Sequence, residues 1–298
     1  MGVSPAPDPD RVVFDHVLAA LVHGSGYERI ATPGCSDRTI RRRVAEWAER
    51  IVGVELLNAA LAAYDQMIGL DLEDLSLDGS ITQSLCGGEL SGRSPVDRGK
   101  QGTKRSVVTD GRGIPLALVA AGANRHDSPL FEPTMRQIPD MIGALPERPC
   151  VHLDRGYDSA GTRDLLDELG YVYEIARKGV PAPIQAGKRW VVERTHSWMN
   201  GYGKVRRCTE KRRVVAELYL YLAATLTVIR RLINQARTRY RWPTRPTTED
   251  SSNHQLPVVL SRLREDLTDR LFDLSAFVVS PANAWSSFWI NQLTREGR

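Results

Sequence analysis

Two apolar runs joined by a tight turn constrain the fold of this chain more than any other feature of its sequence. Residues 104–109 and 114–121 both have the composition of strands, and the segment Asp-Gly-Arg-Gly at 110–113 joins them. An Asp-Gly pair between apolar runs is a strong signal for a β-hairpin. We therefore expect an antiparallel pair of strands within the sheet that this chain forms.

The segments around this hairpin alternate between the two kinds of secondary structure. Short buried strands are expected at 75–78, 151–154 and 171–176, and helices at 129–137, 159–169, 188–200 and 214–240. Such alternation is typical of domains in which helices cover a sheet. The sequence therefore predicts an α/β fold with one mixed sheet flanked by helices.

The first 70 residues have a different pattern and read as a small helical domain. Apolar residues recur close to a 3.6-residue period within 12–22, Ser36 suits the N-cap of a second helix, and a third helix is expected at 55–68. A helix, a Gly-containing turn and a basic second helix form the helix-turn-helix pattern, with a helical bundle of charged surface as the alternative. The arginines expected to face DNA from the second helix are Arg38, Arg41, Arg42 and Arg43.

Basic residues are concentrated in one part of the chain. The net charge is +4, but residues 188–245 contain 15 Lys or Arg against 3 Asp or Glu (+12), and residues 246–298 contain 5 against 7 (−2). A dense basic block is either a solvated surface or a polyanion site, and we favour the polyanion. We accordingly predict an N-terminal helical domain at 1–70, a catalytic domain at 71–245 and a C-terminal appendage at 246–298.

Composition excludes several other classes of protein. No apolar run approaches the roughly 18 residues of a membrane-spanning helix, and residues 1–10 lack the apolar core of a signal peptide. Four scattered cysteines without a C-x-x-C pair indicate reduced thiols rather than a zinc site or a disulfide framework. We therefore expect a cytoplasmic protein.

Three acidic residues occupy positions suited to metal binding. Asp78 and Asp154 each close an apolar run, and Glu193 lies in a helical segment. Magnesium takes oxygen ligands, commonly one or two carboxylates plus phosphate oxygens. Two such ions about 3.5–4 Å apart can clamp both oxygens of a phosphodiester displacement. In a basic chain, this triple predicts a site for two Mg²⁺ or Mn²⁺ ions that acts on double-stranded DNA.

Each acid also has a purely structural interpretation as a cap, a turn residue or half of a surface ion pair, but the three together favour a site. On the predicted helix, Ser197 and Asn200 share the face of Glu193, with His196 at its edge, and would line a DNA path. The rival acids, which we assign to turns or caps and to a helix start, are Asp110, Asp158 and Asp127. The further basic residues expected to hold DNA are Arg98, Lys100, Lys104, Arg189, Arg194, Lys204, Arg206, Arg207 and Lys211.

These acids and their surroundings resemble a known family, the DDE transposases of bacterial insertion sequences, and within it the insertion-sequence-five group. The resemblance runs from about residue 21 to about residue 248. It is most specific in Leu-Asp-Gly-Ser at 77–80, Ser-Pro-Val-Asp-Arg-Gly-Lys-Gln-Gly at 94–102, Gly-Ala-Asn-Arg-His-Asp-Ser at 122–128, Leu-Asp-Arg-Gly-Tyr-Asp at 153–158 and Trp-Val-Val-Glu-Arg at 190–194.

The resemblance implies an RNase H-like catalytic domain whose three acids match Asp78, Asp154 and Glu193. It also implies metal-dependent cleavage at inverted-repeat ends, transfer of the 3′-hydroxyl to target DNA, and a homodimer as one arrangement for pairing two ends. The residue pattern does not separate this activity from an RNase H-like nuclease without strand transfer, or from a non-catalytic DNA-binding regulator.

The chain departs from the family pattern Tyr-x2-Arg-x3-Glu-x6-Lys at two positions. Arg189 matches the arginine, but Ala186 stands at the tyrosine position and Asn200 at the lysine position, so Lys204 is a candidate replacement. The acidic tail from Glu249 is also atypical, which suggests a shifted or fused reading frame that would weaken activity.

Overall fold

A computed structural model describes residues 9–177 and 188–239 of the chain. Its contacts divide the chain into two compact units, residues 1–229 and 230–298. The first unit contains every strand and nearly every helix of the described residues, and the second contributes only the end of the last helix to them. Ala186 and the predicted appendage at 246–298 lie outside the described residues, and the three-domain division stays a prediction.

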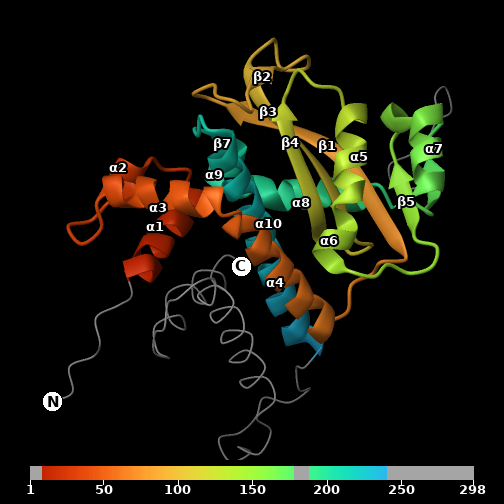
Figure 1. The fold of residues 1–298 in the computed structure, drawn as a ribbon, viewed down its shortest axis with the longest axis horizontal. Coiled ribbons are helices and arrows are strands. Elements are labelled where there is room, and N and C mark those ends of the chain that lie inside the picture. The colour runs from red at the N-terminus through yellow and green to blue at the C-terminus, as the bar shows by residue number, and fades with distance from the viewer. Residues whose placement is uncertain (1–8, 178–187, 240–298) are drawn as a thin grey trace, which may run out of the picture. The chain divides into compact units, whose positions relative to one another are not determined.

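A mixed sheet forms the centre of the first unit (Figure 1). Strand β1 lies in the middle, pairs antiparallel with β3, which pairs with β4, and pairs parallel with β5, which pairs with β6. The strands are β1 (Asp74–Ser84), β2 (Gly92–Arg93), β3 (Gln101–Thr109), β4 (Pro115–Gly122), β5 (Cys150–Leu153), β6 (Val172–Ile175) and β7 (Arg207–Cys208).

Helices cover both faces of this sheet. Thr134 of α5 bonds Ser106 of β3, whereas the adjacent Arg105 bonds His196 of α8. Successive residues of a strand point to opposite faces, so α5 and α8 lie on opposite sides. The helices are α1 (Pro9–His23), α2 (Tyr27–Ile30), α3 (Asp37–Glu49), α4 (Val52–Met67), α5 (Ser128–Arg136), α6 (Ile138–Ile142), α7 (Ala160–Glu168), α8 (Trp190–Asn200), α9 (Gly203–Arg206) and α10 (Arg213–Arg239). The predicted mixed sheet flanked by helices is confirmed.

The hairpin predicted from the sequence joins β3 to β4. The Oδ1 atom of Asp110 accepts hydrogen bonds from the backbone N–H groups of Arg112 and Ile114, at 2.9 and 2.7 Å. Its Oδ2 atom accepts from the N–H of Asp71 at 3.1 Å. Asp110 is fully buried, so these bonds satisfy a carboxylate that water does not reach. The assignment of Asp110 to a turn is therefore confirmed.

The second predicted N-terminal helix, α3, begins where the sequence predicts, whereas α1 and α4 each begin three residues earlier than expected. The Ser36 hydroxyl accepts from the backbone N–H of Thr39 at 3.2 Å, which caps α3. The buried side of α3 includes Ile40 and Val44, and Trp47 makes an edge contact with Phe14 of α1. The one-turn helix α2, which the sequence did not predict, lies between α1 and α3. DNA binding by this part of the chain stays a prediction.

Asp78 does not end a strand, contrary to the sequence interpretation. Strand β1 continues to Ser84, because its second half pairs with β3 as far as Gln83. The parallel pairing of β1 with β5 does end early, at Ser76 and His152. Asp78 thus lies just beyond the parallel part of the sheet. None of the described helices is both long enough and apolar enough to cross a membrane.

Candidate metal-binding active site

The three predicted acids lie at one end of the parallel part of the sheet. The last residue of β1 that pairs with β5 is Ser76, and Asp78 comes two residues later. Asp154 directly follows β5. Glu193 lies in the first turn of α8, which contacts β1. Parallel strands bring their carboxyl ends to the same edge of a sheet, which is where ligands commonly bind in open α/β folds.

Asp78 and Glu193 are in direct contact. The pKa of the half-buried Asp78 is raised to about 8, first by burial and then by the hydrogen bond and negative charge of the Glu193 carboxyl, while a hydrogen bond from Gly79 opposes the rise. That opposing bond joins the Gly79 N–H to Asp78 Oδ1 at 2.7 Å. Two carboxyl groups this close disfavour double ionisation unless a cation lies between them.

Asp154 is held by an arginine from the start of α8. Arg189 donates from Nη1 to Asp154 Oδ1 at 2.8 Å, and its side chain is 14% exposed whereas that of Asp154 is 49% exposed. Arg189 occupies the N-cap position of the helix that carries Glu193, although its side chain makes no capping hydrogen bond. The Arg189 guanidinium therefore ties Asp154 to the start of the helix that carries Glu193.

A buried tyrosine hydroxyl lies close enough to both Asp78 and Asp154 for their charges to affect its pKa. The Oη atom of Tyr157 has no hydrogen-bond partner among the described residues, although the side chain is 2% exposed. The pKa of Tyr157 is raised, first by burial and then by the negative charges of Asp78, Asp127 and Asp154. An orphaned hydroxyl among carboxylates is a donor suited to a ligand or an ordered water molecule.

Asp127 is a member of this group of acids, which corrects its assignment to helix-start chemistry. It occupies the N-cap position of α5, but its side chain makes no capping hydrogen bond. Instead its Oδ1 lies 3.0 Å from Nζ of Lys104, whose side chain is 7% exposed. The same oxygen lies only 2.1 Å from the position that a Cβ on Gly79 would occupy, so this glycine admits the carboxylate beside Asp78. The sequence signal for Asp127 was present in Asn-Arg-His-Asp, but a local helix-start interpretation also explained it.

A buried cationic layer supports α8 from the sheet. Arg105 of β3 is 1% exposed and donates from Nη2 to Asn200 Oδ1 at 2.8 Å and to the His196 carbonyl at 3.3 Å. Burial and the Arg105 charge lower the pKa of His196 to about 3, so its ring is neutral at physiological pH. His196 and Asn200 therefore face the sheet, which corrects the prediction that they line a DNA path.

The predicted DNA-binding residues fall into exposed and buried groups. Lys204 is 2% exposed, and its Nζ bonds Thr209 at 2.9 Å and Glu210 at 2.5 Å. This placement contradicts the predicted DNA contact of Lys204 and its role as a replacement lysine, because the ammonium is buried and already bound to Glu210 and Thr209. Lys104 is also buried. The exposed members of the predicted set are Arg38, Arg41, Arg42, Arg98, Lys100, Arg206, Arg207 and Lys211.

The remaining predicted cations are partly buried and paired. Arg43 bonds Asp10 and Glu46 at 3.0 and 2.8 Å. Arg194 lies over the rings of Trp190 and Trp198, at 4.4 and 4.8 Å from their centroids, and donates to the Arg112 carbonyl. The two tryptophans thus form a sandwich around an arginine.

A pocket of about 440 Å³ opens beside Gly79 and Asp127. Its lining includes Gly79, Lys104 and Asp127, so it is continuous with the acidic group. The rest of the lining combines cationic and polar side chains with a small apolar wall, namely Arg93, Asn124, Arg125, His126, Ile81, Pro95 and Val96. A phosphate-bearing ligand fits this lining, because it could contact the cationic side chains and the apolar wall at the same time.

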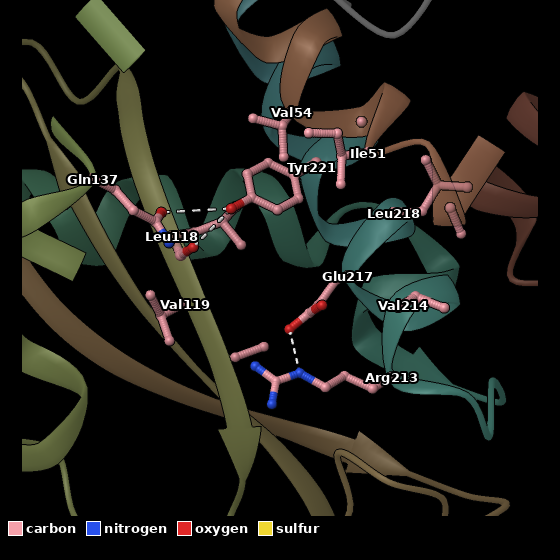
Figure 2. A pocket seen from close by; sticks show the side chains of 13 residues that line it. Ile51, Val54, Leu118, Val119, Gln137, Arg213, Val214, Glu217, Leu218 and Tyr221 are labelled. Atoms are coloured by element: carbon pink, nitrogen blue, oxygen red, sulfur yellow. Dashed lines mark hydrogen bonds and ion pairs between the residues drawn. The ribbon is translucent and has the colours of Figure 1, made fainter. Parts of the chain in front are cut away.

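Figure 2 shows a second pocket, of about 290 Å³, whose lining is different. Tyr221 donates to the Leu118 carbonyl at 3.1 Å, and Arg213 pairs with Glu217 at 2.8 Å. Most other lining side chains are apolar, including Ile51, Val54 and Leu218. This pocket holds no group of acids and carries no chemistry that we can assign.

The acidic group meets the requirements of a divalent metal. Its donors are carboxylate oxygens, which Mg²⁺ and Mn²⁺ prefer. The raised pKa of Asp78 shows that its charge lacks compensation from the protein alone. Asp78, Asp154 and Glu193 could hold such ions, and Asp127 adds a fourth carboxylate to the group. The fold and the group of carboxylates together define an α/β domain with an acidic centre suited to divalent ions.

Comparison with known proteins identifies the family. The model of the transposase DDE domain family matches residues 84–180. A putative transposase for insertion sequence element IS402 from Burkholderia cepacia is 37% identical over 141 residues, which cover 46% of this chain and 67% of that protein. The chain belongs to the DDE transposases, whose domains use divalent metals.

Solved transposase structures show a more distant similarity. The piggyBac transposase, in a synaptic complex with hairpin DNA, aligns with a TM-score of 0.34 and 12% identity, covering 74% of this chain. The chain spans 61% of the length of that protein. The Mos1 strand transfer complex aligns with a TM-score of 0.32 and 11% identity, covering 82% of each chain.

Proposed function

We propose that this protein is a DNA transposase that cuts at the inverted-repeat ends of an insertion sequence and joins the 3′-hydroxyl ends to target DNA by two-metal phosphoryl transfer. The observation that carries the proposal is the direct contact of Asp78 with Glu193, beside a Tyr157 hydroxyl that also lies near Asp154. The membership of the insertion-sequence-five group, the cytoplasmic location and the pairing of two protomers in a synaptic complex belong to the same proposal.

The acids have distinct roles in this proposal. Asp78 is the most buried of the three acids and adjoins Glu193, so it suits a position that bridges the two ions. The half-exposed Asp154 and the exposed Glu193 would each bind one of the ions. When bound, two divalent ions supply Lewis-acid stabilisation of the attacking and leaving oxygens. Arg189 orients Asp154, and the neutral His196 with Arg105 fixes α8 against the sheet.

DNA would approach over the exposed cations. Arg206, Arg207 and Lys211 follow α8 in the chain, and Arg98 and Lys100 lie in the loop before β3. Arg93 and Arg125 line the pocket that begins at Gly79, so they would hold backbone phosphates close to the acids. Contacts of this type make DNA affinity fall steeply with salt concentration.

The test uses DNA that brackets the gene. Labelled duplexes carrying the terminal repeats would be incubated with Mg²⁺ and a target plasmid, and both cleavage and joined products would be measured. The proposal predicts both products, and it predicts that Asp78→Asn, Asp154→Asn and Glu193→Gln abolish them while DNA binding survives. Cleavage without joining would favour the nuclease, and unaltered function in all three variants would favour the regulator.

A further inference from the structure

A second group of metal-ligating side chains lies at the opposite end of the parallel strands from the three acids. Asp74 begins β1 and pairs directly with Cys150, which begins β5, and His152 follows two residues later on the same face. Their carboxylate oxygen, sulfur and imidazole nitrogen all lie within 4.8 Å of one another. Three different donors from two adjacent strands thus converge on one small space.

This donor set differs in kind from the acidic active site. Magnesium takes oxygen ligands, whereas a thiolate, an imidazole and a carboxylate suit Zn²⁺. Bonds of about 2.0–2.3 Å from zinc to each donor are compatible with donors that lie this close together. One carboxylate and one thiolate would also balance the two positive charges of the ion.

Neighbouring residues already orient these donors. His152 Nδ1 lies 3.1 Å from Glu174 Oε2, and its Nε2 faces Asp74 Oδ1 at 2.7 Å. A carboxylate that accepts the Nδ1 proton directs the lone pair of Nε2 toward a metal, and this arrangement is common around zinc. Lys188 binds Oδ2 of Asp74, which leaves Oδ1 turned toward the histidine.

We propose that Asp74, Cys150 and His152 bind one Zn²⁺ ion, with water in the fourth position. The ion cross-links the beginnings of β1 and β5, the two strands that carry Asp78 and Asp154 farther along. The ion would hold the two strands together at the end of the sheet away from the three acids. The scattered cysteines gave no sign of it, because its ligands come from two strands that are distant in the sequence.

Cobalt substitution tests the donor set directly. The reduced, chelator-treated full-length protein would be titrated with Co²⁺, which gives a thiolate-to-cobalt charge-transfer band in the near ultraviolet when a cysteine binds it. We expect one equivalent of this band in the wild type, in the exposed-cysteine control Cys86→Ser and in Asp78→Asn. We expect its loss in Cys150→Ser. A wild type without the band, or a band that persists in Cys150→Ser, overturns the proposal.

A second measurement needs no substitution and so does not depend on the variant folding. Alkylation of the wild-type thiols would be followed by peptide mass spectrometry with and without Zn²⁺. At a zinc concentration about 100 times the dissociation constant, alkylation of Cys150 should slow by about 100-fold, because only the free fraction reacts. Cys86, which is exposed, serves as the internal control. Equal rates at Cys150 with and without zinc contradict the site, whatever the outcome of the DNA assays.

Discussion

Arg189 donates a hydrogen bond from Nη1 to Oδ1 of Asp154 across 2.8 Å, and this pair connects two elements of the proposed metal site. Arg189 lies at the N-cap position of α8 and Asp154 follows β5 directly, so the bond ties the helix of Glu193 to the end of a strand. A planar guanidinium holds a carboxylate in a fixed orientation, which the ammonium of a lysine does not. Arg189 is thus a positioning residue for the second acid.

Removing this arginine should lower the metal affinity of the site without unfolding the protein. Arg189→Ala and Arg189→Lys are both expected to lower the affinity for Mn²⁺, and the rate of DNA cleavage, by about 10- to 100-fold, the usual cost of losing a partner of a metal ligand. Titration of Mn²⁺ by electron paramagnetic resonance measures the affinity. Arg136→Ala is the matched control, since Arg136 makes two surface ion pairs on α5. Full Mn²⁺ affinity in both Arg189 variants would disprove the positioning role.

The close approach of Asp127 to Gly79 predicts a coupling that can be measured. A Cβ at residue 79 would meet Asp127 Oδ1 at 2.1 Å, and that carboxylate is also tied to Lys104. We expect Gly79→Ala to destabilise the protein by about 1–3 kcal/mol, the usual cost of overpacking.

In an Asp127→Ala background the same change should cost less, because the clashing oxygen is gone. Urea unfolding of the four proteins gives the coupling free energy. Equal costs in the two backgrounds would show that the contact is not the source of strain.

Asp110 predicts a pH dependence of stability with a definite sign. Burial raises its pKa in the folded protein to about 6, above the usual value of 3.8, and the three backbone hydrogen bonds oppose this rise. The folded state therefore holds the proton more tightly than the unfolded state. The stabilisation from this group is fully present below about pH 4 and is lost as the pH rises through 6.

Comparison with Asp110→Asn isolates the effect from other titrating groups. The free energy of unfolding of the wild type minus that of the variant should be larger at pH 5 than at pH 7. Urea titrations at the two pH values measure it. A difference that is larger at pH 7 reverses the assigned direction of the pKa shift.

Two basic residues close together in the sequence should behave in opposite ways. Lys204 is buried in an ion pair with Glu210 and lies 4.9 Å from the centroid of the Tyr27 ring, whereas Arg206 is exposed. Lys204→Ala should destabilise the protein by about 3–5 kcal/mol, because it leaves a buried carboxylate unpaired.

Arg206→Ala should leave stability nearly unchanged and should lower DNA affinity with a shallower salt dependence. Thermal unfolding and fluorescence anisotropy at several salt concentrations separate the two effects. A stable Lys204→Ala protein with weak DNA binding would restore the original interpretation of Lys204.

Local sequence patterns were enough to predict most of the element types, whereas the role of the three acids stays a prediction. The hairpin at 110–113 and the cap at Ser36 depend on hydrogen bonds within a few residues, and each forms as expected. Such signals are present in any short window of sequence.

Features set by distant contacts were not predictable in this way. The length of β1 depends on its pairing with β3, the role of Asp127 depends on Lys104 and Gly79, and the burial of Lys204 depends on helices at both ends of the first unit. Each of these residues has an equally good local interpretation. A single sequence therefore indicated which acids to consider, but not which neighbours surround them.

The most direct test of the account is the position of Mn²⁺ in crystals of the protein bound to a DNA duplex that carries its terminal repeat. Anomalous scattering locates the ions without reference to activity. The account predicts two peaks about 3.5–4 Å apart among the carboxylates of Asp78, Asp154 and Glu193, beside a DNA phosphate. Well-ordered DNA with no manganese among these three carboxylates would contradict it.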